Sequence, residues 1–202
     1  DKSGNIWIGS YNAGILFFDV KTEKIHAIKQ AKLPTEKIVF VTLISPQELL
    51  ISTEDKGVFI YYIPQQKSYP LIAKAKTDRQ FKAYSIKAFD NSDWIICSNQ
   101  GLYFLNKHSK KIRPCFRKLD DTFGWLEIHD ILILNEHKFI ITSKSDGLFT
   151  LEHGTKKNQV NIYQSSQDIF QKHALLYNAA SVLMRDKNST YWVGTERGLC
   201  SF

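Results

Sequence analysis

The sequence predicts an all-β fold: a β-propeller fragment of about four and a half four-stranded antiparallel blades, with a repeat of about 45 residues. Three observations predict it. One strand–loop–strand motif occurs five times, its glycine recurs at spacings of 43, 44, 46 and 51 residues, and aromatic residues make up 13% of the chain. Many of these aromatic residues lie in short apolar runs, which are typical of strands rather than helices.

The repeated motif joins two short apolar strands through a polar loop. The first strand ends in a hydroxyl residue, and the second strand begins at the glycine. A tight return often needs a positive φ, which glycine reaches without steric cost, and a hydroxyl can bond to backbone groups of the adjacent loop. No His and acid recur beside the hydroxyls as a catalytic triad requires, so we predict no catalytic residues. The hydroxyl residues are Ser10, Thr53, Ser98, Ser143 and Thr195, and the recurring glycines are Gly14, Gly57, Gly101, Gly147 and Gly198.

Each copy of the motif has a further strand on either side. Short polar turns connect the preceding strand to the motif, which predicts antiparallel hairpins. A weaker strand follows a lysine that lies ten residues after the glycine in each complete copy. The preceding strands are residues 38–44, 84–89, 128–134 and 180–185, and the following strands include residues 24–28, 111–115 and 160–163. One unit is therefore four short strands, which is the size of a propeller blade.

The whole chain is interpreted as a partial β-propeller, with blade cores near residues 1–30, 37–72, 84–116, 127–164 and 179–202. The first copy begins after its innermost strand and the last stops within its third strand. We therefore expect the remaining propeller blades of the same polypeptide to complete the ring, because a closed ring needs whole blades. Residues 165–176 break the β pattern and account for the longest spacing. Ser165 or Ser166 can cap a helix there, so we predict a short helical insertion.

The net charge of +7 would suit an acidic partner such as an anionic polysaccharide, a membrane surface or nucleic acid. Two lysine-rich segments, residues 107–111 and 156–157, occupy predicted turns between third and fourth strands. Lysine at such a turn protects the outer edge of a sheet from pairing with other chains, so we interpret the charge as a solvated rim. The sequence has no compact arginine cluster and no nucleic-acid motif, so no nucleic-acid partner is expected.

No metal or cofactor is expected. The cysteines Cys97, Cys115 and Cys200 are too few and too scattered for a zinc site or a disulfide framework. Six histidines show no ligand spacing. Of these, His129 lies in an innermost strand; it could face the channel, but a hydrogen-bonded structural role is expected. No apolar run approaches the roughly 20 residues that span a membrane.

A ligand site is expected at one end of the blades. In propellers, the loop entering the innermost strand and the loop between the second and third strands share one face around the central channel, where a concave site can form. Aromatic rings there can stack on a sugar, while amides and charged groups bind its hydroxyls. The alternative is that these polar residues only fill surface loops. The predicted ligand-binding residues are Tyr11, Asp55, Asn99, Asp146 and Arg197 in loops between second and third strands, and Trp125, Tyr177 and Asn178 in entering loops.

The first and last copies carry a longer pattern. In the first copy, residues 1–10 include Trp7-Ile8-Gly9-Ser10 and are followed by Gly14, and in the last, residues 178–199 include Asp186 and Trp192-Val193-Gly194-Thr195. This pattern resembles the two-component regulator propeller repeat family. The three middle copies keep only the hydrophobic residues, the hydroxyl and the glycine. At the level of the blade period, the resemblance covers nearly the whole chain.

The resemblance implies the periplasmic sensor propeller of a hybrid two-component histidine kinase, the ectodomain of an inner-membrane protein. It implies detection of glycan fragments, with an oligosaccharide as partner, signalling to a kinase elsewhere in the protein, and no enzyme activity in this region. A homodimer is expected for the full-length protein, with membrane contact only through a segment outside this chain. Two alternatives remain: a non-catalytic scaffold for protein interaction or dimerisation, and a propeller lyase, which needs an acid/base pair at the channel mouth.

Overall fold

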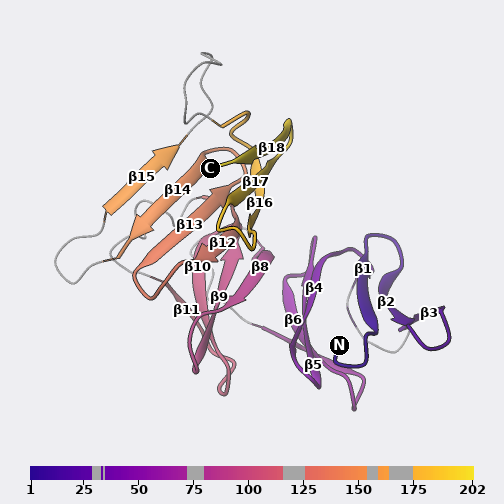
Figure 1. The fold of residues 1–202 in the computed structure, drawn as a ribbon. Coiled ribbons are helices and arrows are strands. Elements are labelled where there is room, and N and C mark those ends of the chain that lie inside the picture. Colours follow the sequence, from indigo (N-terminus) through magenta and orange to yellow (C-terminus); the bar gives the residue numbers. More distant parts are fainter. Residues whose placement is uncertain (29–32, 34, 72–79, 116–125, 154–158, 164–174) are drawn as a thin grey trace. The chain divides into compact units, whose positions relative to one another are not determined.

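The described part of the chain forms five antiparallel sheets of three or four strands (Figure 1). The structure is a computed structural model that describes residues 1–28, 33, 35–71, 80–115, 126–153, 159–163 and 175–202. Within these ranges every regular element is a strand, as predicted. The predicted helical insertion at 165–176 lies outside the described residues except for its last two positions, which are not helical.

Each sheet contains the strands of one sequence repeat in chain order, starting from the innermost strand except in the first sheet, which starts at the second strand of its repeat. The first and last sheets have three strands and the others have four. The strands are β1 (Ile6–Ser10), β2 (Gly14–Asp19) and β3 (Lys24–Ala27); β4 (Ile38–Ser45), β5 (Glu48–Thr53), β6 (Val58–Tyr62) and β7 (Lys67–Pro70); β8 (Ala83–Ala88), β9 (Asp93–Ser98), β10 (Gly101–Asn106) and β11 (Ile112–Pro114); β12 (Ile128–Ile133), β13 (Lys138–Ser143), β14 (Gly147–Glu152) and β15 (Gln159–Tyr163); and β16 (Ala180–Arg185), β17 (Tyr191–Thr195) and β18 (Gly198–Ser201).

The sheets belong to two compact units, Asp1–Ala83 and Tyr84–Phe202. The first unit contains the sheets β1–β3 and β4–β7. Its core is formed by apolar residues of both sheets, because each sheet buries one face against the other. The fully or nearly buried members of this core are Ile15, Ile38, Leu49, Ile51 and Tyr61.

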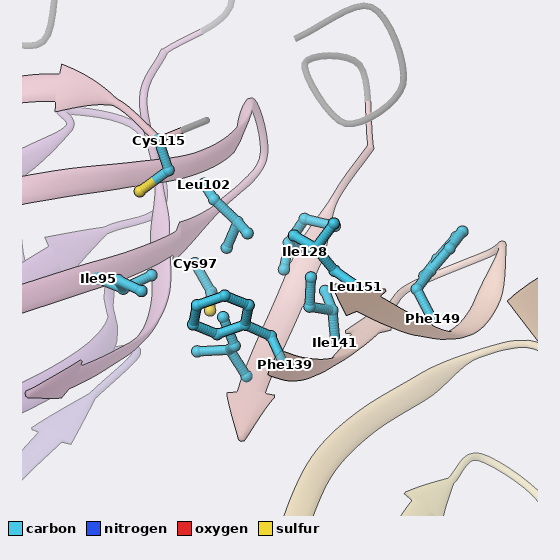
Figure 2. Packing of buried hydrophobic residues seen from close by; sticks show 10 residues of the cluster. Ile95, Cys97, Leu102, Cys115, Ile128, Phe139, Ile141, Phe149 and Leu151 are labelled. Atoms are coloured by element: carbon cyan, nitrogen blue, oxygen red, sulfur yellow. The ribbon is translucent and has the colours of Figure 1, made fainter. Parts of the chain in front are cut away.

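Two cores hold the second unit together. Figure 2 shows the larger core, in which side chains of the β8–β11 sheet pack against side chains of the β12–β15 sheet. The smaller core joins the β12–β15 sheet to the β16–β18 sheet through residues that include Leu148, Leu183 and Val193. Cys97 belongs to the larger core, and burial raises the pKa of its thiol well above the ordinary value. The thiol therefore stays protonated and packs as a small hydrophobic group.

The recurring glycines and hydroxyls have the structural roles predicted for them. All five glycines have a positive φ, from 67° to 132°. The hydroxyls of Thr53, Ser98 and Thr195 each donate to the carbonyl oxygen of the glycine in the same loop, at 2.7, 2.7 and 2.9 Å. Ser143 instead donates to the carboxylate of Asp146, at 2.9 Å. These hydroxyls are therefore engaged in holding the loops that they precede.

A backbone hydrogen bond connects the loop of one sheet to the segment entering the next. The amide N–H groups of Gly14, Gly101 and Gly147 donate to carbonyl oxygens of the following sheet's entering segment, at 3.1, 3.1 and 3.0 Å. The acceptors are Glu36, Leu126 and Asn178, each two residues before an innermost strand. Consecutive loops thus lie side by side within each unit, so their side chains can act together.

Three innermost strands contain a β-bulge at their second residue. The register between first and second strands shifts around Val39 in β4, His129 in β12 and Ser181 in β16. A bulge leaves one residue without a partner on the neighbouring strand and redirects its side chain. The position equivalent to these residues in β8 is Tyr84, the second residue of that strand.

The carboxylate of Asp130 connects the innermost strands of the second unit. Its side chain is almost fully buried, and Oδ1 accepts hydrogen bonds from the hydroxyl of Ser85 at 2.7 Å and from the amide of Ile131 at 3.0 Å. Oδ2 accepts a hydrogen bond from the amide of Leu183 at 3.0 Å, and Lys87 Nζ lies 3.0 Å from Oδ1. The innermost strands of three successive sheets, β8, β12 and β16, therefore contact one buried carboxylate.

The lysines between β10 and β11 pack on a tryptophan. Lys107 Nζ and Lys110 Nζ each lie 5.5 Å from the centre of the Trp94 ring, and Lys107 also donates to the carbonyl oxygen of Asp90. Such contacts are cation–π interactions, which tie the basic turn to its own sheet. This arrangement supports the structural interpretation of the rim lysines, and residues 156–157 lie outside the described residues.

Candidate ligand-binding site

Polar and aromatic side chains gather where the loops of the second unit meet. We call this set the loop-face cluster: it comprises Tyr84, Glu127, His129, Lys144, Tyr177, Glu196 and Arg197. Its members come from the bulge positions, from entering segments and from loops between second and third strands of three successive sheets. The bonds between recurring glycines and entering segments explain why these loops are neighbours.

Glu127 is bonded on both sides within the cluster. The hydroxyl of Tyr84 donates to Glu127 Oε1 at 2.9 Å, and Lys144 Nζ lies 3.5 Å from Oε2. The amide of Lys144 also donates to the backbone carbonyl of Glu127, at 3.0 Å. The bond from Tyr84 joins the β8–β11 sheet to the β12–β15 sheet. Both carboxylate oxygens of Glu127 therefore already have a partner within the cluster.

His129 stacks on Tyr84. The ring centres are 4.3 Å apart and the planes are inclined by 27°. Burial lowers the pKa of His129, while Glu127, Asp130 and Glu196 act in the opposite direction. The Nε2 atom is buried and has no hydrogen-bond partner among the described residues. The hydrogen bond expected of a structural histidine is therefore not made through Nε2, and the ring instead stacks on Tyr84.

Arg197 and Tyr177 form a stacked pair in the loops of the β16–β18 sheet. The guanidinium carbon of Arg197 lies 4.5 Å from the centre of the Tyr177 ring. The amide of Arg197 donates to Thr195 Oγ1 at 3.3 Å, and the amide of Glu196 donates to the carbonyl oxygen of Ala179 at 3.1 Å. The turn that carries Arg197 is thus fixed to the segment that carries Tyr177.

The second unit also contains other predicted ligand residues, with different roles. Asp146 accepts hydroxyl hydrogens from Ser143 and Ser145, and Asn178 supplies the carbonyl that binds the Gly147 amide. Their loops adjoin those of Tyr177 and Arg197. Asn99 is buried, with 8% of its surface exposed, so it supports its loop more than it faces solvent.

Of the predicted ligand-binding residues, Tyr177 and Arg197 are the two that belong to the loop-face cluster within the described part of the chain. Tyr11 and Asp55 belong to the first unit and are exposed, and the ammonium of Lys37 lies 5.9 Å from the centre of the Tyr11 ring. Trp125 lies outside the described residues. Each unit therefore presents its own loop-face residues.

The ligand-binding residues predicted from the sequence omitted five members of the cluster: Tyr84, Glu127, His129, Lys144 and Glu196. A signal for one of them exists in the repeat. When the innermost strands are aligned from their first residues, Tyr84 aligns with the bulge residues Val39, His129 and Ser181. Large polar rings at two successive copies of this position distinguish these sheets from the others.

Within the described ranges, no group of three His, Cys, Asp or Glu side chains is placed to hold a metal ion. No helix in the same ranges is long and apolar enough to cross a membrane. The loop-face cluster combines hydrogen-bonding groups with partly buried aromatic rings, which suits the binding of a polar organic molecule.

No protein-family model and no curated protein matches the sequence. Solved structures do match. The extracellular domain of a protein assigned to a one-component system of B. thetaiotaomicron has a TM-score of 0.78 at 15% identity, over 98% of this chain and 26% of that chain. The extracellular domain of a protein assigned to a hybrid two-component system of the same organism has a TM-score of 0.73 at 18% identity, over 96% and 24%.

A WD40 β-propeller domain, that of Doa1, has a TM-score of 0.61 at 12% identity, over 98% of this chain and 60% of that chain. Together with the five small antiparallel sheets, these similarities confirm the predicted β-propeller fold class. The chain spans about a quarter of the length of the two extracellular domains. At sequence identities of 12% to 18%, these similarities show the fold alone.

Proposed function

We propose that this chain is part of the periplasmic ligand-sensing propeller of a hybrid two-component histidine kinase and that it binds glycan fragments. Signal transfer to a kinase and a homodimeric full-length protein belong to the same proposal. The observation that carries it is the loop-face cluster, in which short side-chain contacts join the β8–β11 and β12–β15 sheets and the stacked Arg197–Tyr177 pair lies in the adjoining loops of the β16–β18 sheet. The extracellular domains with the same fold support the sensor role.

The chemistry of the cluster favours binding over catalysis. A general acid–base pair needs groups that are free to exchange protons with a substrate. Glu127 is bonded to Tyr84 and Lys144, and Nε2 of His129 is buried. Aromatic rings, an arginine and a carboxylate with lone pairs to spare are the groups that recognise sugar hydroxyls and the apolar face of a sugar ring.

Calorimetric titration of a panel of neutral and acidic oligosaccharides, with wild-type protein and variants, tests this function. Tyr84→Ala and Tyr177→Ala are expected to weaken binding about tenfold each, because each loses a ring worth roughly 1.5 kcal/mol of stacking. Lys111→Ala, on the lysine-rich rim, is the matched control and should bind normally. Circular dichroism of each variant verifies that its fold is retained.

Three outcomes would contradict the proposal. Absence of binding to every member of the panel favours a scaffold for protein interaction. Loss of affinity only in Lys111→Ala, with a steep dependence on salt, favours a polyanion-binding rim. Cleavage of an oligosaccharide during the titration favours a propeller lyase.

A further inference from the structure

We propose that Arg197 and Tyr177 form a subsite for the single carboxylate of an acidic sugar, such as a hexuronate. This inference rests on the proposed function, because it names the class of glycan that the loop-face cluster selects. Its starting point is the stacked arginine–tyrosine pair, with 4.5 Å between the guanidinium carbon and the ring centre.

The stacked pair holds the guanidinium in place before any ligand binds. The Tyr177 ring contacts one face of the Arg197 side chain. The amides of Glu196 and Arg197 donate to the carbonyl oxygen of Ala179 and to Thr195 Oγ1, and these two bonds fix the turn. A planar guanidinium held in this way retains its fork of N–H donors for another partner. Because less side-chain freedom remains to be lost, a carboxylate binds it at a smaller entropic cost.

Arg197 also differs from Lys144, the other cation of the loop-face cluster. Lys144 has Glu127 as its ion-pair partner, at 3.5 Å. Arg197 is exposed and has no ion-pair partner among the described residues. Elsewhere in this unit, Arg113 is paired with Asp93. The charge of Arg197 is therefore available to an anion, and its geometry matches two oxygens of one carboxylate.

The surroundings favour one negative charge and several hydroxyls over a polyanion. Glu196 precedes Arg197 in the turn, and its charge reaches His129. Asp146 lies in the adjoining loop, which is bonded to Asn178. Carboxylates in these positions repel a second anionic group but accept hydrogen bonds from sugar hydroxyls. A hexuronate carries one carboxylate on a ring with several hydroxyls, so it satisfies both requirements.

Saturation-transfer NMR of the 202-residue protein with D-galacturonate and with D-galactose tests the subsite. The two sugars differ at one carbon, which bears a carboxylate in the first and a hydroxymethyl group in the second. Galacturonate is expected to bind about tenfold more tightly, as for a charge-assisted bidentate contact. Arg197→Ala should remove this preference, and Arg197→Lys should restore only part of it, because lysine keeps the charge without the fork.

The possible results separate this inference from the proposed function. Equal binding of both sugars, with loss of both in Tyr177→Ala, overturns the carboxylate subsite and leaves glycan binding intact. A galacturonate preference that persists in Arg197→Ala, or that disappears in the control Lys111→Ala, also overturns the subsite. Absence of binding by either sugar, while a neutral oligosaccharide binds in calorimetry, overturns the acidic class alone. Absence of binding in both experiments overturns both proposals.

Discussion

A buried carboxylate gives the second unit a single point where three innermost strands meet. Asp130 has 4% of its surface exposed and accepts hydrogen bonds from Ser85, Ile131 and Leu183. Lys87 supplies a compensating charge. A buried charge is tolerated only when it is paired and hydrogen-bonded. Removing the carboxylate would in turn leave its hydrogen-bond donors without an acceptor.

Replacing Asp130 is expected to lower the free energy of unfolding of this unit by about 3 kcal/mol, because the Leu183 amide and the Ser85 hydroxyl would be left without an acceptor. Asp130→Ala should show the full loss, and Asp130→Asn a smaller one, since the amide oxygen can still accept. Urea unfolding measures both. Lys87→Met, at a side chain that is 41% exposed, is the control and should lower the free energy of unfolding by less than Asp130→Ala does. An equal loss in both variants would show that the ion pair, and not the hydrogen bonds, provides the stabilisation.

The environment of His129 predicts a stability that depends on pH. Burial lowers the pKa of His129 in the folded protein below the ordinary value of 6.5. Between that value and the lower folded pKa, the unfolded chain binds more protons than the folded chain, so the free energy of unfolding falls as pH falls. Thermal unfolding from pH 8 to pH 5 checks this. His129→Gln should remove the part of the slope due to this group; an unchanged slope would assign it to other residues.

At the scale of the elements, the recurring glycines and Gly9 are required for different physical reasons. The recurring glycines are needed for their positive φ. Gly9 instead lies at a close approach between sheets, where an added Cβ would meet Ile38 Cγ2 at 2.7 Å and Val41 Cγ1 at 3.3 Å. Both contacts come from the innermost strand of the next sheet. This explains the glycine in Trp7-Ile8-Gly9-Ser10, where the sequence alone offered only a resemblance.

Gly9→Ala is therefore expected to lower the free energy of unfolding of the first unit by about 2 kcal/mol, since the new methyl group overpacks a sheet interface. Gly14→Ala is the comparison. It has a φ of 67° and no atom within 4 Å of an added Cβ, so it should cost only the backbone strain, about 1 kcal/mol. Denaturant unfolding of both variants ranks them. A larger cost for Gly14 would contradict the packing explanation for Gly9.

Local pattern was enough to predict most of the strands. Alternating or continuous apolar runs bounded by polar turns depend on neighbouring residues alone, and so do the positive φ of Gly101 and the hydroxyl bond of Ser98. The loop-face cluster was predicted only in part, because its contacts join residues such as Tyr84 and Glu127 that lie more than 40 residues apart. The bulge that aims His129 arises from the pairing of two strands and has no local sequence signature.

At the scale of the whole molecule, one sheet face differs from its equivalents. The residue after the recurring glycine is Ile15, Val58, Leu102 and Leu148 in the first four sheets, and all four are buried. Its equivalent in the last sheet, Leu199, is 61% exposed. Val182 and Met184 of the adjoining β16 are also more than half exposed. An apolar face of this kind indicates an interaction surface.

The 202-residue protein studied alone is therefore expected to associate through this face. Light scattering at increasing concentrations should show a rising average mass. A double variant, Val182→Lys/Leu199→Lys, should lower that mass, because two charges cannot be buried without partners. Asn188→Lys, in an exposed turn, adds charge elsewhere and should leave association unchanged. A monomer at every concentration would contradict this prediction, because it would show that the face carrying Val182 and Leu199 does not drive association.

The bonds from Gly14, Gly101 and Gly147 to the next entering segments also divide the repeat into a constant and a variable part. From the accepting carbonyl to the next glycine, Glu36 to Gly57, Leu126 to Gly147 and Asn178 to Gly198 are 21, 21 and 20 residues apart. From the donating glycine to the carbonyl, the separations are 22, 25 and 31 residues for Gly14, Gly101 and Gly147. The extra length of the longer copies therefore lies between the donating glycine and the accepting carbonyl, ahead of the next innermost strand. Such a chain can acquire new recognition surfaces during evolution while the spacing that stacks its sheets is inherited unchanged.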